Sequence, residues 1–132
     1  MAKKTARQRV VKRLDDVTSQ YIRQRDQACV QCSSKENLTN GHVFSRRAYN
    51  TRWDISANGN CHTQCWGCNF RHSIDNYDYF KWYVDKFTQK QFEELRFRYR
   101  TTQKYTTAEL EELYEELTTA HKELVNESET CK

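Results

Sequence analysis

Apolar residues recur at helical spacing in four stretches of the chain, and this spacing is lost over residues 26–70. Over residues 7–25 they recur every three or four positions with basic side chains between them, which predicts an amphipathic helix. Two further stripes, over residues 76–87 and 92–99, predict helices whose apolar faces lie in the core. Residues 95–100 alternate as a strand would, but the preceding Gln-Phe-Glu-Glu favours a continued helix.

A last helix is predicted to begin at Thr106, because Glu109 three residues later completes a capping box. Its apolar residues occupy a and d heptad positions, which makes a short leucine seam. The seam has two interpretations, packing onto the rest of the chain or a homodimer contact. Its members are Leu110, Leu113, Leu117, Ala120 and Leu124.

The stretch over residues 26–70 is polar, rich in turns and contains all three glycines, which predicts two or three short strands and loops. Two Cys-x-x-Cys pairs flank it, namely Cys29, Cys32, Cys65 and Cys68. Zinc takes four thiolates in a tetrahedron, so two such pairs predict a closed, structural zinc site. Buried thiols or a disulfide are the alternatives, but the matched spacing disfavours them. Cys61 and Cys131 are predicted to be free thiols.

The composition makes a structural metal useful. With 132 residues, 36% of them hydrophobic, the chain allows one domain with a small core. It has no apolar run long enough for a membrane span and no signal peptide, since the N-terminus is charged throughout. We therefore expect a soluble intracellular protein without membrane contact, in a compartment that keeps thiols reduced.

The net charge is +4, and the charged residues are distributed unevenly along the chain. Residues 1–25 carry eight Lys or Arg and two Asp, whereas residues 106–132 carry eight Glu and two Lys. A basic arm beside a mildly basic centre is typical of proteins that neutralise phosphates, although a solvated charged helix looks similar.

His42 is the candidate reaction centre, because it follows a glycine between the two cysteine pairs, within reach of Asn69 and His72. A neutral His can take a proton from water, and a divalent cation opposite it can stabilise a phosphodiester transition state. Asn69 and His72, about one turn apart, could face the same cation. Alternatively, Asn69 is a helix N-cap and His72 a solvent-facing side chain.

The order Cys-x-x-Cys, Gly-His, Asn, Cys-x-x-Cys-Asn resembles the HNH endonucleases with a ββα-metal, treble-clef-type core. More narrowly, the chain resembles the NinG (Rap) recombination proteins of bacteriophage lambda and its relatives, over about residues 21–79 and more weakly to about residue 95. The matching segments are Tyr21-Ile-Arg-Gln-Arg-Asp26, Cys29-Val-Gln-Cys32, Gly41-His-Val-Phe-Ser-Arg46, Thr51-Arg-Trp-Asp54, Asn60 and Gln64-Cys-Trp-Gly-Cys-Asn69.

The resemblance implies an α+β fold, with a small zinc-stapled core over residues 26–88. A basic arm and helix precede the core over residues 1–25, and helices with an acidic last helix follow it over residues 89–132. The four paired cysteines match the zinc ligands, His42 the general base, and Asn60 the residue that pins the loop after the first strand.

The same resemblance assigns Asn69 as a ligand of a catalytic Mg²⁺ or Mn²⁺. Many HNH nucleases carry a metal-binding Asp just before the base, where this chain has Gly41. The second protein ligand is therefore open among His72, Asp54 and Asp75.

The implied activity is metal-dependent cleavage of branched DNA such as D-loops and Holliday junctions. Phosphate contacts are expected from Arg46, Arg47, Arg52 and Arg71. A homodimer would supply two sites for symmetric cleavage, and a phage-encoded chain would act in the host cytoplasm. Two other functions fit the sequence: a non-catalytic zinc module that binds nucleic acid, and an adaptor whose acidic terminal helix binds a recombination partner.

Overall fold

The computed structural model describes residues 2–130 and contains helices and one small antiparallel sheet. In chain order the elements are α1 (Ala6–Asp26), β1 (Leu38–His42), α2 (Tyr49–Arg52), β2 (Cys61–Cys65), α3 (Trp66–Ile74), α4 (Tyr77–Lys86), α5 (Gln89–Arg100) and α6 (Thr107–Thr130). The mixed fold and the long terminal helices that the sequence predicts are confirmed. The short helix α2 was not predicted. Cys131 lies outside the described residues.

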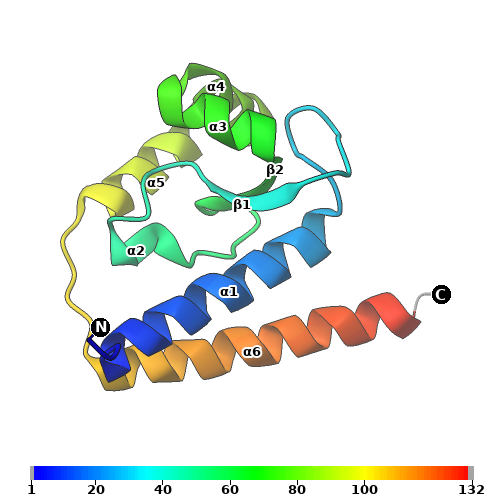
Figure 1. Ribbon diagram of the computed structural model, residues 1–132. Coiled ribbons are helices and arrows are strands. Elements are labelled where there is room, and N and C mark those ends of the chain that lie inside the picture. The colour runs from blue at the N-terminus through cyan, green and yellow to red at the C-terminus, as the bar shows by residue number, and fades with distance from the viewer. Residues whose placement is uncertain (1, 131–132) are drawn as a thin grey trace.

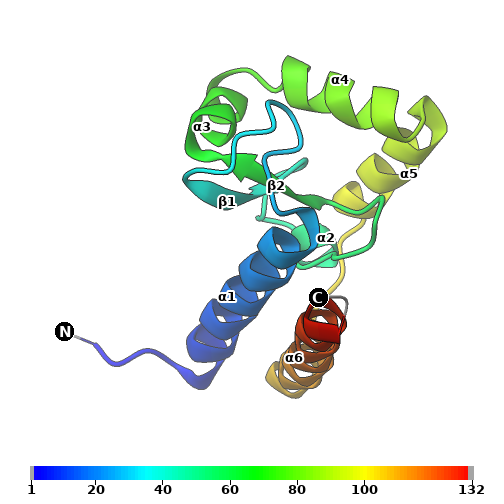
Figure 2. The same ribbon diagram turned by 90° about the vertical axis from the view of Figure 1, so that its right-hand side faces the viewer.

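The sheet pairs β1 with β2, so that Leu38 lies opposite Cys65 and His42 opposite Cys61. It lies between α1 on one side and α3 and α4 on the other (Figures 1 and 2). The Oγ1 of Thr63 donates to the Ile22 carbonyl of α1, and the hydroxyl of Tyr79 in α4 donates to the Gly41 carbonyl. The two short strands thus depend on helices on both sides for their burial.

The long helices α1 and α6 run side by side (Figures 1 and 2). Both apolar stripes meet in one cluster, whose buried members are Val10, Leu14, Val17, Trp53, Leu110 and Leu117. The predicted capping box is present, since Thr106 Oγ1 accepts from the Glu109 N–H at 3.1 Å and Glu109 Oε1 from the Thr106 N–H at 3.0 Å. Of the two interpretations of the leucine seam, the structure shows packing onto the chain for these leucines.

The second core joins the end of β1 to α4 and α5, around Val43, Phe44, Tyr79, Tyr83 and Leu95. The stretch over residues 95–100 is helical rather than extended, and Thr88 caps this helix by accepting from the Gln91 N–H at 3.0 Å. Among the described residues, no helix is both long enough and apolar enough to cross a membrane.

Candidate metal centre and adjoining cleft

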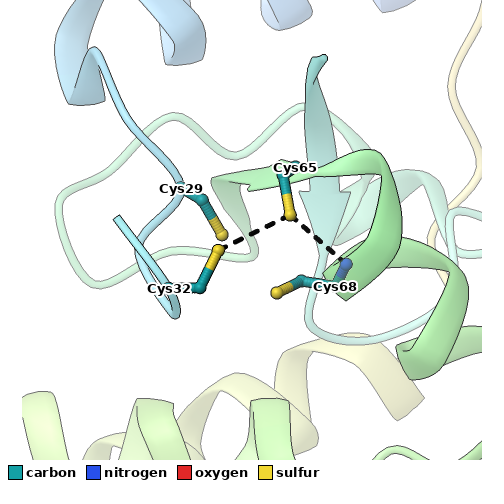
Figure 3. Close-up of side chains that lie close together, drawn as sticks. All are labelled: Cys29, Cys32, Cys65 and Cys68. Atoms are coloured by element: carbon teal, nitrogen blue, oxygen red, sulfur yellow. Dashed lines mark hydrogen bonds between the residues drawn. The ribbon is translucent and has the colours of Figure 1, made fainter. Parts of the chain in front are cut away.

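The four paired cysteines come together at one end of the sheet. The sulfur atoms of Cys29, Cys32, Cys65 and Cys68 all lie within 4.8 Å of one another, and those of Cys32 and Cys65 are 3.6 Å apart (Figure 3). A zinc ion with Zn–S bonds of about 2.3 Å needs sulfurs about 3.8 Å apart at tetrahedral angles. Cys61 is a free thiol outside this cluster. The cysteine cluster therefore could bind a metal ion such as zinc.

Backbone turns hold each pair in place. The first pair lies on a tight turn in which the Ser33 N–H donates to the Cys29 carbonyl at 2.9 Å, with Ser33 in the left-handed region at φ 66°. Cys65 is the N-cap of α3, and its sulfur accepts from the Cys68 N–H at 3.4 Å. Burial of the Cys29 thiol raises its pKa. Hydrogen bonds from the backbone N–H groups of Cys65, Cys32 and Gln31 outweigh this effect and lower the pKa of Cys29 to about 7.

A cleft of about 740 Å³ opens beside the sheet, between the end of β1 and α3. It is lined by three of the predicted site residues, His42, Asn69 and His72, and by Arg46 from the loop after β1. The structure thus brings together, on one concave surface, a histidine, an amide and a second histidine that lie up to thirty residues apart in the chain.

His42 is held in one orientation by the backbone of α2. Its Nε2 lies 3.0 Å from the Arg52 carbonyl oxygen and must carry the proton, because a carbonyl can only accept. The thiol of Cys61, opposite His42 in the sheet, donates to the same carbonyl at 3.3 Å. Burial lowers the pKa of His42 to about 4, so the ring is neutral near pH 7 and Nδ1 is its basic nitrogen.

Asn60 fixes the loop that follows His42. Its Oδ1 accepts from the Phe44 N–H at 2.8 Å, its Nδ2 donates to the Phe44 carbonyl at 2.9 Å, and its own carbonyl accepts from the Val43 N–H at 2.8 Å. The side chain is fully buried. Asn60 therefore supports the loop without lining the cleft.

Asn69 and His72 each leave one acceptor atom unused. Asn69 Nδ2 donates to Thr39 Oγ1 at 2.9 Å, and no described residue hydrogen-bonds its Oδ1. His72 Nε2 donates to the carbonyls of His42 and Val43, both at 3.0 Å, while its Nδ1 is buried without a hydrogen-bond partner among the described residues. Burial lowers the pKa of His72, so this ring is also neutral. Asn69 is not the N-cap of α3, since Cys65 occupies that position.

The other candidate ligands, Asp54 and Asp75, do not line this cleft. Asp54 forms an ion pair with Arg98 at 3.0 Å, and Asp75 accepts from the Tyr77 N–H at 3.0 Å at the start of α4. Gly41 lies beneath Gln64, because a Cβ at position 41 would come within 2.0 Å of Gln64 Oε1. An aspartate at position 41 therefore could not fit without displacing Gln64.

A scan against protein-family models adds an independent comparison. The model of the bacteriophage lambda NinG protein family matches residues 1–127. The chain belongs to this NinG family. No curated protein and no solved structure matches it. The NinG match extends well beyond the segments that carry the resemblance in the sequence, through α1 and most of α6.

Three of the four candidate phosphate contacts in this NinG chain are exposed, namely Arg46, Arg47 and Arg71. The fourth, Arg52, forms a two-point ion pair with Asp15 of α1, at 2.9 Å through Nε and 2.7 Å through Nη2. Trp53 Nε1 donates to the same carboxylate at 2.8 Å, and these hydrogen bonds outweigh burial and lower the pKa of Asp15. The guanidinium of Arg52 is therefore neutralised within the fold.

Asp15 and Cys61 contribute to the site, although the sequence analysis assigned Asp15 no role and Cys61 only that of a free thiol. Asp15 holds Arg52, whose carbonyl orients His42, and Cys61 donates to that same carbonyl. Cys61 could have been recognised only from its strand position opposite His42. Asp15 carried no signal, because an acidic residue on a charged helix is ordinary.

Proposed function

We propose that this NinG-family chain is a metal-dependent DNA endonuclease with an HNH-type, ββα-metal core. The proposal is supported above all by the cleft that His42, Asn69 and His72 share beside the cysteine cluster. In this assignment the cysteine cluster holds a structural zinc ion and takes no part in the reaction, since four thiolates leave no open position.

His42 acts as the general base. Its Nε2–H bond to the Arg52 carbonyl fixes the tautomer and leaves Nδ1 to take a proton from a water molecule. A pKa of about 4 keeps His42 in the proton-accepting form over the whole physiological range. As the water oxygen bonds to the phosphorus, Nδ1 gains the water proton and the P–O bond to the leaving strand breaks, and a proton from a second water neutralises the leaving oxygen. Asn60 keeps the adjoining loop in place.

Asn69 lines the cleft and has a free amide oxygen, which suits a hard divalent cation. Asn69 Oδ1 would hold Mg²⁺ or Mn²⁺ together with water, which Mg²⁺ retains readily. His72 Nδ1, buried and without a hydrogen-bond partner among the described residues, would be the second donor if its ring turned toward the cleft. When bound, such a cation neutralises charge on the scissile phosphate and the leaving oxygen. Since Gly41 supplies no carboxylate, we assign His72 as the second protein ligand in its place.

The substrate we propose is branched DNA, held through its phosphates. Arg46 lines the cleft and Arg47 beside it is exposed, so each can contact a phosphate. Neither residue lies in a helix that could enter a groove and read the base edges. The basic residues of α1 add a further positive surface. Binding should therefore weaken steeply with salt and vary little with sequence.

The test compares cleavage of linear duplex, single strand, a D-loop and a four-way junction, each with Mg²⁺ or Mn²⁺. We expect cleavage of the branched substrates, and we expect Asn69→Ala to require more cation for half-maximal rate. Asn76→Ala, which alters the same cleft away from the proposed ligands, is the matched control. Binding of all four substrates without any cleavage would favour the non-catalytic zinc module instead.

A further inference from the structure

Helix α3 carries an exposed apolar stripe that belongs to neither hydrophobic core of the described residues. Trp66, Phe70 and Ile74 follow one another at intervals of four residues and are 63%, 53% and 73% exposed. The rings of Trp66 and Phe70 are stacked, with centroids 5.3 Å apart and planes 7° from parallel. Exposed aromatic groups of this size on a small protein usually mark a binding surface. We call Trp66, Phe70 and Ile74 the α3 stripe.

The α3 stripe adjoins the cleft on the same helix. Asn69 and Ser73 line the cleft, and each immediately precedes a stripe residue, Phe70 and Ile74 respectively. Successive residues are about 100° apart around a helix about 10 Å across. A strand held in the cleft could therefore reach the stripe without leaving α3.

The charge around the α3 stripe suits an anionic partner. No residue of Trp66–Ile74 is acidic, and Arg71 is exposed and forms no ion pair within the described residues. Two carboxylates lie nearby, since Asp75 and Asp78 line a small pocket together with Arg71, and Asp75 also accepts from the Tyr77 N–H. Exposed flat rings on a helix that also carries an exposed arginine are the kind of groups on which unpaired bases of single-stranded nucleic acid stack.

We infer that the α3 stripe stacks unpaired bases of DNA next to the cleft. Base faces are hidden inside a continuous duplex and become available where strands separate at a branch. The stripe would thus select substrates with unpaired nucleotides, a selection that phosphate contacts from Arg46 and Arg47 do not provide. The position of this stacking beside a nuclease cleft rests on the proposed function, but the stacking itself is tested by binding alone.

The experiment measures binding of a short fluorescein-labelled oligothymidylate and of a duplex of equal length, without added divalent cation. The variants are Trp66→Leu, which keeps an apolar side chain but removes the ring, and Trp66→Phe, which keeps a ring. Phe97→Leu is the matched control, because Phe97 is an exposed aromatic residue on α5, 74% exposed. Zinc content and far-ultraviolet circular dichroism verify that each variant is folded.

We expect Trp66→Leu to bind the oligothymidylate about 10- to 100-fold more weakly, with duplex binding unchanged. Trp66→Phe should retain most of the affinity, and Phe97→Leu should match the wild type. Unchanged oligothymidylate binding in Trp66→Leu would overturn the inference, and so would equal losses for both probes. Unchanged binding together with dissociation of a wild-type dimer would assign the stripe to self-association instead. Because no cleavage is needed, a protein that never cuts DNA can still pass this test.

Discussion

Replacing Asn60 with Ala should destabilise the protein by about 2–4 kcal/mol. The substitution removes two buried hydrogen bonds at once and leaves both the N–H and the carbonyl of Phe44 without a partner. A buried polar group that loses its partner costs about 1–3 kcal/mol. The third bond, from the Val43 N–H to the Asn60 backbone carbonyl, does not depend on the side chain and should persist.

Urea denaturation measures this loss. With an m value of about 2 kcal/mol per molar, the midpoint should fall by about 1–2 M at unchanged m. Asn76→Ala is the control, because Asn76 is exposed and its side chain makes no capping hydrogen bond to α4, so its midpoint should stay close to that of the wild type. If Asn60→Ala and Asn76→Ala unfold at the same urea concentration, the loop after β1 does not depend on the Asn60 side chain, contrary to this prediction.

Three further predictions concern the cysteine cluster, the helix pair and pH. Cys65→Ser should lose most of its bound zinc by metal analysis, whereas Cys61→Ser should keep about one ion per chain; equal loss in both would contradict the assignment of ligands. Leu117→Ala should lower the unfolding free energy by about 2–4 kcal/mol, because Leu117 is buried in the cluster that joins α1 and α6, with a midpoint independent of protein concentration. A concentration-dependent midpoint would point to a dimer. Burial lowers the pKa of His42 and of His62 to about 4, so on acidification the unfolded chain takes up protons first. The contribution of these two neutral histidines to the free energy of unfolding should be complete above pH 6.5. It should be lost between pH 6.5 and 4, by up to about 3 kcal/mol per histidine. Zinc content measured at each pH separates this loss from release of the metal.

The helices and the cysteine cluster could be predicted because their signals are local. A stripe of apolar residues every three or four positions and a capping box at Thr106 each depend on a few neighbouring residues. The matched spacing of the two Cys-x-x-Cys pairs predicts that their four thiols come together, and the structure places the sulfur atoms within 4.8 Å of one another.

The contacts that orient the residues of the cleft could not be predicted, because they join residues far apart in the chain. Arg52 looked like a phosphate ligand, but Asp15, thirty-seven positions away, neutralises it. His72 anchors its ring on the backbone of β1, thirty positions away, which no helical pattern shows. The leucine seam was ambiguous for the same reason, since the sequence shows an apolar face but not which helix covers it.

The most direct test of the proposed mechanism is the single-turnover rate of four-way-junction cleavage by wild type and His42→Ala, at equal zinc content and saturating Mg²⁺. We expect His42→Ala to bind the junction as wild type does but to cut it about 10²- to 10⁴-fold more slowly, which is the usual contribution of a general base. Equal cleavage rates for the two proteins would contradict the role of His42 as the general base.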